Sequence, residues 1–278
     1  MSVFPMRCSV RNCLLPLGKS DDGMRCEAGH HFNQARQGYW NLTQPQDSKS
    51  SNPGDCDAAV EARSSWLERG HMNGFVEKLK SWLELYPADR DVMPLSLELG
   101  CGEGSISAAL FEREAIGYCG IDLSKRAIKL AARRLPAATW VLANADRTLP
   151  VPDHSVDRVL SLFGRRPTAE IARVLRPGGV CIVAVPGAQD LAELREQVQL
   201  AATTRSRLDA VESEMLAVGL RVLQREIWTH QVQLDSAALS SAMAMTYRAV
   251  RHSQQSRLSQ LTEMTVTLQA DLIALQNG

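Results

Sequence analysis

One short glycine-rich turn constrains the fold of this chain more than any other feature. Its residues are Glu98-Leu-Gly-Cys-Gly-Glu-Gly104. An apolar run typical of a buried strand, Leu95–Leu99, leads into the turn, and a segment with helical spacing, Ser105–Arg113, follows it. Glycines allow a backbone to turn sharply and to lie against a ligand without an intervening side chain. The pattern predicts a strand–turn–helix corner that binds a nucleotide-like ligand, with a purely structural corner as the alternative interpretation.

Strand-like and helix-like segments alternate from Met93 onward. Such alternation predicts an α/β fold, in which helices cover both faces of a mainly parallel sheet. The expected strands are Leu95–Leu99, Gly117–Ile121, Thr139–Leu142, Val156–Leu162, Val180–Val185, Gln224–Val232 and Met264–Leu275. The expected helices are Ser105–Arg113, Ser124–Leu135, Thr168–Leu175, Leu191–Ala202, Arg207–Val218 and Ala237–Val250.

Acidic side chains surround the glycine turn. Asp122 ends the second expected strand, twenty positions after Gly102. A carboxylate at this place in a nucleotide-binding fold can accept hydrogen bonds from both ribose hydroxyls. Glu98 and Glu103 would repel a diphosphate at close range, so they favour a ligand that carries a cationic amino group.

Four motifs in this order resemble the class I S-adenosylmethionine (SAM)-dependent methyltransferases. They are the glycine turn, Asp122, Asn144-Ala-Asp146 and Arg173-Val-Leu-Arg-Pro-Gly-Gly179. The resemblance covers Met93–Gly278 and implies a Rossmann-like, seven-stranded, mostly parallel sheet whose last strand runs antiparallel. It also implies that SAM lies across the carboxyl ends of the first strands. The residues implied in cofactor binding are Glu98, Gly100, Gly102, Glu103, Gly104, Asp122, Leu123, Asn144 and Asp146.

Cysteines crowd the first thirty residues. Cys8, Cys13, Cys26 and His30 have the spacing of a tetrahedral zinc site, for which His31 is a competing ligand. Three thiolates and one imidazole would close the site completely, so the zinc would be structural. A segment with so few core-forming residues needs such a constraint in order to fold. The alternative is four unconnected residues in a flexible arm.

The chain divides into three expected parts. We expect a zinc-binding module over residues 1–45, a linker and helical segment over 46–90, and the SAM-dependent methyltransferase domain over 91–278. The formal net charge is zero, so nucleic-acid binding would depend on a local basic patch. The sequence contains no apolar run long enough to span a bilayer and no signal-peptide pattern, which predicts a cytoplasmic location without membrane partners.

Motifs in the N-terminal part and the linker indicate a more specific family within the SAM-dependent methyltransferases. The motifs that follow, together with Cys26-x3-His30-x-Phe32, resemble the large-subunit rRNA guanine-N1 methyltransferases of the RlmA type. The resemblance implies methyl transfer to N1 of a guanine in a 23S rRNA hairpin, with the zinc module helping to hold the RNA. These motifs are Gly38-Tyr-Trp-Asn-Leu42, Asn52-Pro-Gly-Asp55, Glu61-Ala-Arg63 and Leu67-x-x-Gly70-His71.

Two segments depart from that family and could shape the pocket of the target base. They are Ser161-Leu-Phe163-Gly164-Arg165-Arg166 and Met245-Thr246-Tyr247. Arg165 and Arg166 are expected on the carboxyl side of the sheet, where they could contact phosphates. A further basic cluster on the helix after Asp122 is interpreted as a solvated face more readily than as an RNA site. Its members are Lys125, Arg126, Lys129, Arg133 and Arg134.

Guanine N1 carries a proton at neutral pH, so the reaction must remove it. No general base stands out, and Asp55 and His71 are the candidates. The competing interpretation makes Asp55 a helix cap and His71 a helix-end residue. Two other functions stay open, namely a methyltransferase of a small molecule and an RNA-binding assembly factor with a vestigial SAM pocket. A homodimer is one candidate assembly.

Overall fold

The computed structural model describes residues 4–11, 13–45, 47, 54–87, 93–199, 206–246 and 256–278. Several predictions from sequence fall outside these residues. They concern most of the linker (46 and 48–53, including Asn52), the ends of two predicted helices (200–202 and 247–250) and Tyr247. No helix in the described ranges is long and apolar enough to cross a membrane.

The main sheet has eight strands in the order β10-β11-β9-β8-β5-β6-β7-β4. Strands β4 to β9 pair in parallel, and β11 runs antiparallel to both of its neighbours. This confirms the predicted seven strands with an antiparallel last strand, and β4 adds an eighth. The strands are β4 (Trp40–Asn41), β5 (Ser96–Leu99), β6 (Tyr118–Asp122), β7 (Thr139–Leu142), β8 (Val156–Leu162), β9 (Leu175–Pro186), β10 (Leu220–Asp235) and β11 (Glu263–Asn277).

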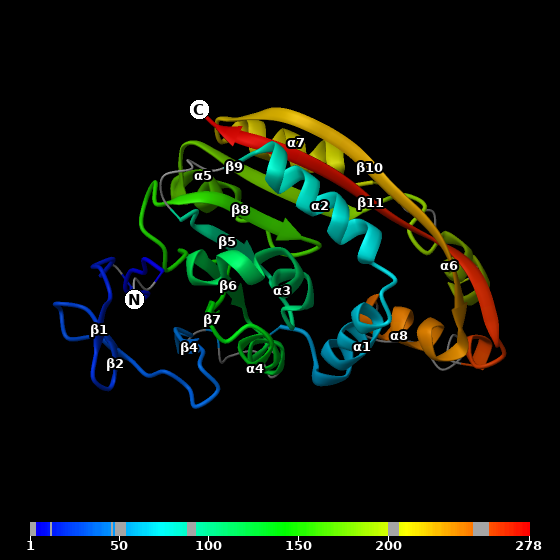
Figure 1. Cartoon of the computed structure of the whole chain (residues 1–278), viewed down its shortest axis with the longest axis horizontal. Coiled ribbons are helices and arrows are strands. Elements are labelled where there is room, and N and C mark those ends of the chain that lie inside the picture. The colour runs from blue at the N-terminus through cyan, green and yellow to red at the C-terminus, as the bar shows by residue number, and fades with distance from the viewer. Residues whose placement is uncertain are drawn as a thin grey trace.

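Helices cover both faces of this sheet (Figure 1). At the far end of the long β10–β11 ribbon, α1 lies beside α8. Helix α2 lies in the predicted helical segment and buries one apolar face, through Phe75, Leu79 and Trp82. The helices are α1 (Asp57–Glu68), α2 (Asn73–Leu85), α3 (Ser105–Phe111), α4 (Lys125–Arg134), α5 (Thr168–Val174), α6 (Ala192–Gln199), α7 (Leu208–Ala217) and α8 (Ser236–Thr246), with a 3-10 turn η2 (Glu112–Gly117).

The N-terminal module is a three-stranded antiparallel sheet of β1 (Gly18–Ser20), β2 (Gly23–Arg25) and β3 (His31–Phe32). It is docked on the main domain and is not a free arm. Buried Arg7 binds Asp153 at 3.0 Å, and its backbone N–H donates to Pro150. Apolar side chains of the module also belong to the same buried cluster as strands β5 and β6 of the main sheet. The module is therefore held in a fixed place relative to the main domain.

Candidate cofactor site and zinc centre

The glycine turn sits between the end of β5 and the start of α3. Gly100, Gly102 and Gly104 have φ angles of 71°, 60° and 81°, a region that side chains strain to adopt. A Cβ on Gly104 would stand 2.8 Å from the Cβ of Ala131, and one on Gly100 would stand 3.2 Å from the Cα of Gly164. A side chain at Gly104 would collide with Ala131, and the positive φ at all three positions strains any residue other than glycine, so the turn depends on its glycines.

Asp122 closes the turn from the next strand. Its Oδ2 accepts a hydrogen bond of 2.9 Å from the backbone N–H of Gly102, and its Oδ1 accepts one of 2.7 Å from that of Ser124. Burial raises the pKa of this carboxyl, although the two N–H donors act in the opposite direction. Gly102 and Asp122 thus lie together, as the sequence predicted, and the carboxylate keeps free lone pairs toward the site.

The two glutamates of the turn differ in their partners. Glu98 is fully buried and accepts hydrogen bonds from Tyr118 (2.6 Å) and Ser107 (2.7 Å). Burial raises the pKa of Glu98 to about 6 despite these donors. Glu103 accepts a hydrogen bond from the backbone of Ser105 through Oε2, while its buried Oε1 has no partner among the described residues.

These features fit SAM. The turn forms a cradle that any Cβ would fill, and Asp122 offers lone pairs for ribose hydroxyls. The unpartnered Oε1 of Glu103 and the ionisable Glu98 suit a nearby ammonium group. Gly100, Gly102 and Gly104 would line the amino-acid end of the cofactor, and Asp122 with Leu123 would hold its nucleoside end.

Asn144 and Asp146 follow β7, at the expected place for adenine. The side chain of Asn144 is engaged, because Nδ2 donates to Asp47 (3.2 Å) and Oδ1 accepts from the backbone of Asp146. Asp47 is buried and also accepts from Arg147 at 2.7 Å. Burial acts to raise the pKa of Asp47, but hydrogen bonds from Gln44, Asn144 and Arg147 outweigh it and lower the pKa. The sequence did not single out Asp47, because Asp47 belongs to none of the motifs in this polar linker.

Asp55 lies against the loop that follows Asp122. Its backbone carbonyl accepts a hydrogen bond from Ser124 Oγ (3.1 Å), and its charge contributes to the raised pKa of Asp122. The helix-cap interpretation of Asp55 is wrong, because Cys56 is the N-cap of α1 and makes no side-chain capping bond. Asp55 is thus placed at the ribose end of the site.

His71 lies in the turn between α1 and α2. Its ring centroid is 4.5 Å from that of Trp66. Its Nε2 is buried and has no hydrogen-bond partner among the described residues. Burial lowers the pKa of His71, and the nearby charge of Arg69 lowers it further. The neutral imidazole is therefore favoured near pH 7, and its buried Nε2 is left unpaired among the described residues.

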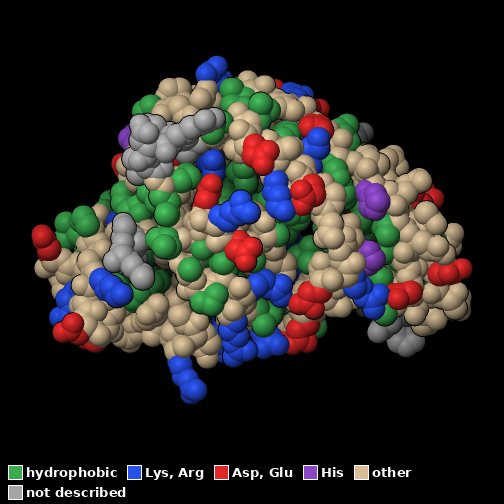
Figure 2. All heavy atoms as spheres, viewed as in Figure 1, with side chains coloured by type: hydrophobic (Ala, Val, Ile, Leu, Met, Phe, Trp, Pro, Cys, Tyr) green, Lys and Arg blue, Asp and Glu red, His purple; other side chains and the backbone are tan. Residues whose placement is uncertain are grey.

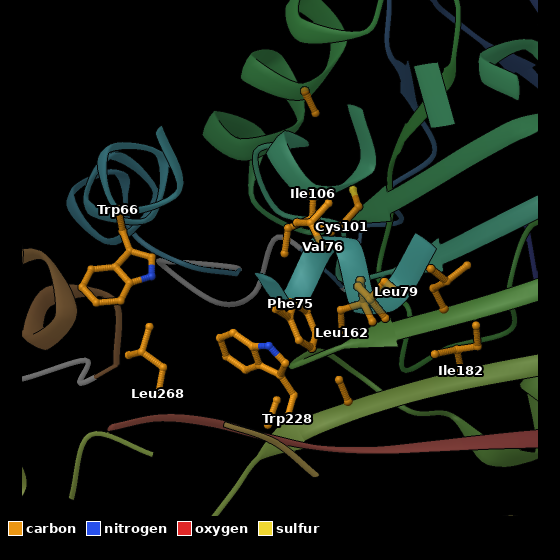
Figure 3. Close-up of a cluster of buried hydrophobic side chains, with 14 of the residues drawn as sticks. Trp66, Phe75, Val76, Leu79, Cys101, Ile106, Leu162, Ile182, Trp228 and Leu268 are labelled. Carbon is orange, nitrogen blue, oxygen red and sulfur yellow. The ribbon is translucent and has the colours of Figure 1, made fainter. Parts of the chain in front are cut away.

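An aromatic cluster borders the carboxyl end of β8. The sequence predicted that the segment after this strand departs from the family and could shape the pocket of the target base. Phe75 lies beside Trp228 of β10, with ring centroids 5.6 Å apart (Figure 3). Phe75 is also 5.3 Å from Phe163, which directly follows β8 and has a φ of 59°. A bulky residue in this conformation is strained, and such strain concentrates at functional sites.

The predicted zinc ligands converge. Single donor atoms of Cys8, Cys13, Cys26 and His30 all lie within 4.8 Å of one another. The separations from His30 Nδ1 are 3.4 Å to Cys8 Sγ and 3.5 Å to Cys26 Sγ, and the sulfurs of Cys13 and Cys26 are 3.7 Å apart. A tetrahedral zinc ion requires edges of about 3.5–3.8 Å between such donors, so the set fits Zn²⁺. His31 instead points to Asp22 at 3.2 Å.

Two of the five basic residues expected on α4 form surface ion pairs with α1. On α4, Arg126 pairs with Glu61 and Arg134 with Glu68, both on α1. Figure 2 accordingly shows Lys and Arg interspersed with Asp and Glu over this face rather than gathered in one positive field. Arg165, just after β8, has a 66% exposed side chain that lies 3.4 Å from the half-exposed Asp146.

Comparison with known proteins agrees with this geometry. Residues 97–183 match the family described as a methyltransferase domain, and residues 7–52 match the one described as the N-terminal part of RlmA. The chain is 33% identical to the 23S rRNA (guanine(748)-N(1))-methyltransferase of Streptomyces fradiae, covering 86% of this chain and 84% of that protein. This chain belongs to the 23S rRNA (guanine-N1)-methyltransferase family.

This methyltransferase also resembles a solved structure in its fold. It superposes on the YcgJ protein of Bacillus subtilis with a TM-score of 0.53 at 16% identity, over 72% of this chain and 98% of that one. The methyltransferase family match and the converging Cys/His cluster show that the enzyme uses SAM and contains a structural zinc site, as predicted from its sequence. The predicted resemblance to the rRNA guanine-N1 methyltransferases is confirmed for both the zinc module and the catalytic domain.

Proposed function

We propose that this methyltransferase transfers a methyl group from SAM to N1 of a guanine in a 23S rRNA hairpin. The observation that carries the proposal is its similarity to a guanine-N1 rRNA methyltransferase along most of the chain, zinc module included. The fixed docking of that module through Arg7 and Asp153 supports it, because an RNA hairpin needs a rigid surface larger than the cofactor pocket.

The chain's own residues have to orient the base and exclude water. When bound, SAM supplies a methyl group that its sulfonium activates toward attack. Partly exposed Phe163 lies next to Gly164, which contacts the glycine turn, and it is backed by buried Phe75, so a splayed guanine can stack on Phe163. Exposed Arg165, at the same end of the sheet, is placed to contact a flanking phosphate.

We assign removal of the N1 proton to His71. Its buried Nε2 accepts no hydrogen bond within the described ranges, and its lowered pKa keeps the ring able to take a proton. Asp55 lies beside the ribose carboxylate, so we assign it to the cofactor end. His71→Asn should lower the single-turnover rate by about 10²- to 10⁴-fold and remove the rate's dependence on an acidic pKa. A variant with the wild-type pH profile would exclude His71 as the base.

Methyl transfer from tritiated SAM tests the substrate. Undermethylated 23S rRNA and a matched small-metabolite extract are incubated separately with the enzyme, and the RNA is digested to nucleosides. Label in 1-methylguanosine supports the proposal. Label in another nucleoside overturns the target base, and label only in small metabolites supports the small-molecule alternative. Bound RNA without any transfer supports the assembly-factor alternative.

Location and assembly follow from the same proposal. An enzyme that modifies rRNA has to reach that RNA, so we propose a cytoplasmic location. A homodimer also stays a prediction. Light scattering on the purified enzyme tests it, and a monomer mass at all concentrations would contradict it.

A further inference from the structure

Arg63 of α1 lies over the glycine turn. Its Nε is 3.4 Å, and its Cδ 3.8 Å, from the point where a Cβ on Gly102 would stand. Its positive charge acts to lower the pKa of both Glu98 and Asp122, so it is within electrostatic reach of both carboxylates. Yet no hydrogen bond or ion pair joins the half-buried guanidinium to another residue in the part of the chain that the structure describes.

Neighbouring contacts hold the helix that carries this guanidinium. Glu61, two positions before Arg63, pairs with Arg126 of α4 at 2.9 Å. Glu68, later on the same helix, pairs with Arg134 of α4 at 3.0 Å. Helix α1 is therefore fixed to α4 on both sides of Arg63. A cation that is already positioned loses little conformational freedom when it binds an anion.

The charges around the turn match those of one end of SAM. Glu98, Glu103 and Asp122 are acidic, and Oε1 of Glu103 is buried without a partner among the described residues. Arg63 adds one unpaired cation above them. The amino-acid end of SAM carries an ammonium group and a carboxylate, next to the sulfonium. The two cationic groups suit the acids, which leaves the carboxylate for Arg63.

We propose that Arg63 binds the carboxylate of SAM and thereby sets the position of the methionine part of the cofactor. A guanidinium can hold a carboxylate through two parallel hydrogen bonds, which fixes its orientation as well as its charge. The inference rests on the SAM dependence of the family. It does not depend on which base is methylated, so binding experiments without RNA test it separately from the proposed substrate.

Calorimetry with three ligands tests the assignment. SAM and S-adenosylhomocysteine carry the carboxylate, whereas decarboxylated SAM lacks only that group. Arg63→Gln should weaken binding of the first two by about 10- to 100-fold, the range for a lost hydrogen bond to a charged group. Binding of decarboxylated SAM should not change. Arg63→Lys, which keeps the charge without the paired geometry, should fall between the wild type and Arg63→Gln.

A matched control lies at the C-terminal end of the same helix, α1. Arg69→Gln removes the same charge, but Arg69 pairs with exposed Asp235 at 2.9 Å, and all three ligands should bind as they do to the wild type. Equal loss for SAM and decarboxylated SAM in Arg63→Gln would overturn the proposal, as would no loss for either. If Arg63→Gln fails to fold, the wild type decides: equal affinity for SAM and decarboxylated SAM would overturn it.

Discussion

The carboxylate of Asp122 accepts a hydrogen bond of 2.9 Å from the backbone N–H of Gly102, which joins the end of β6 to the glycine turn after β5. One side chain thus shapes the turn and also faces the ribose end of the site. A carboxylate has about four lone-pair positions, and the two backbone donors leave the others for the cofactor. The turn and the ribose carboxylate therefore form a single unit.

Asp122→Asn should separate these two roles. The amide keeps one acceptor oxygen but replaces the other with a donor that faces a backbone N–H. SAM affinity should fall by about 10- to 100-fold in calorimetry, because hydrogen bonds to a charged group are lost. Asp209→Asn, on an exposed side chain of α7, is the control and should bind SAM normally. Unchanged affinity in Asp122→Asn would remove Asp122 from the site.

The raised pKa of Glu98 should make the free energy of unfolding depend on pH. Burial raises its pKa to about 6 in the folded protein, above the ordinary value of 4.5. The folded state then holds the proton more tightly than the unfolded chain, so ionisation costs the fold stability as pH rises between these values. Relative to Glu98→Gln, the wild type should lose about 2 kcal/mol of unfolding free energy between about pH 4.5 and pH 7.

Urea unfolding of both proteins across this range measures the difference. Protonation of the zinc ligands acts equally on the wild type and on the variant, so it cancels in the comparison. A difference that stays constant with pH would show that Glu98 does not titrate in this way. The comparison would then exclude burial as the dominant influence on the pKa of Glu98.

The sequence predicts the sheet well because its signals are local. A strand that runs into three glycines, with an acid at the end of the next strand, specifies the corner and Asp122 without any distant contact. Strand β4 has only two residues, so no periodicity could reveal that Trp40 pairs with Val141 of β7. Asp47 and Trp228 gain their roles only from side chains far away in the sequence, which a linear pattern does not contain.

Gly164 was predicted only as part of a segment that could shape the target-base pocket, yet it also controls the fit between β8 and the glycine turn. A Cβ there would stand 2.6 Å from the carbonyl oxygen of Leu99 and 3.4 Å from the Cα of Gly100. Gly164→Ala should therefore displace the turn, cost about 1–3 kcal/mol of stability as overpacking does, and weaken SAM binding. Gly18→Ala is the control, since its Cβ would stand at an ordinary 3.8 Å from Arg25. Equal melting temperatures of both variants would contradict this account.

Loss of zinc should act on the N-terminal module first. The donor atoms of the four ligands lie within 4.8 Å of one another, and three thiolates brought so close repel one another once they are deprotonated without a metal. Cys26→Ala should therefore lose stoichiometric zinc and admit protease within residues 4–42. It should also lower the melting temperature, because the module shares buried apolar contacts with β5 and β6.

Measuring SAM affinity shows whether the zinc module contributes to cofactor binding or only to activity on rRNA. The residues that would hold SAM lie on β5 and β6, in the turns that follow them, and on α1. Cys26→Ala should therefore bind SAM as the wild type does while losing activity on rRNA. Cys56→Ala, on an exposed cysteine outside the cluster, should retain zinc and serves as the control. Retained zinc in Cys26→Ala would overturn the ligand assignment. Lost SAM affinity would show that the module supports the cofactor site directly, since its contacts with β5 would then be required to hold the glycine turn.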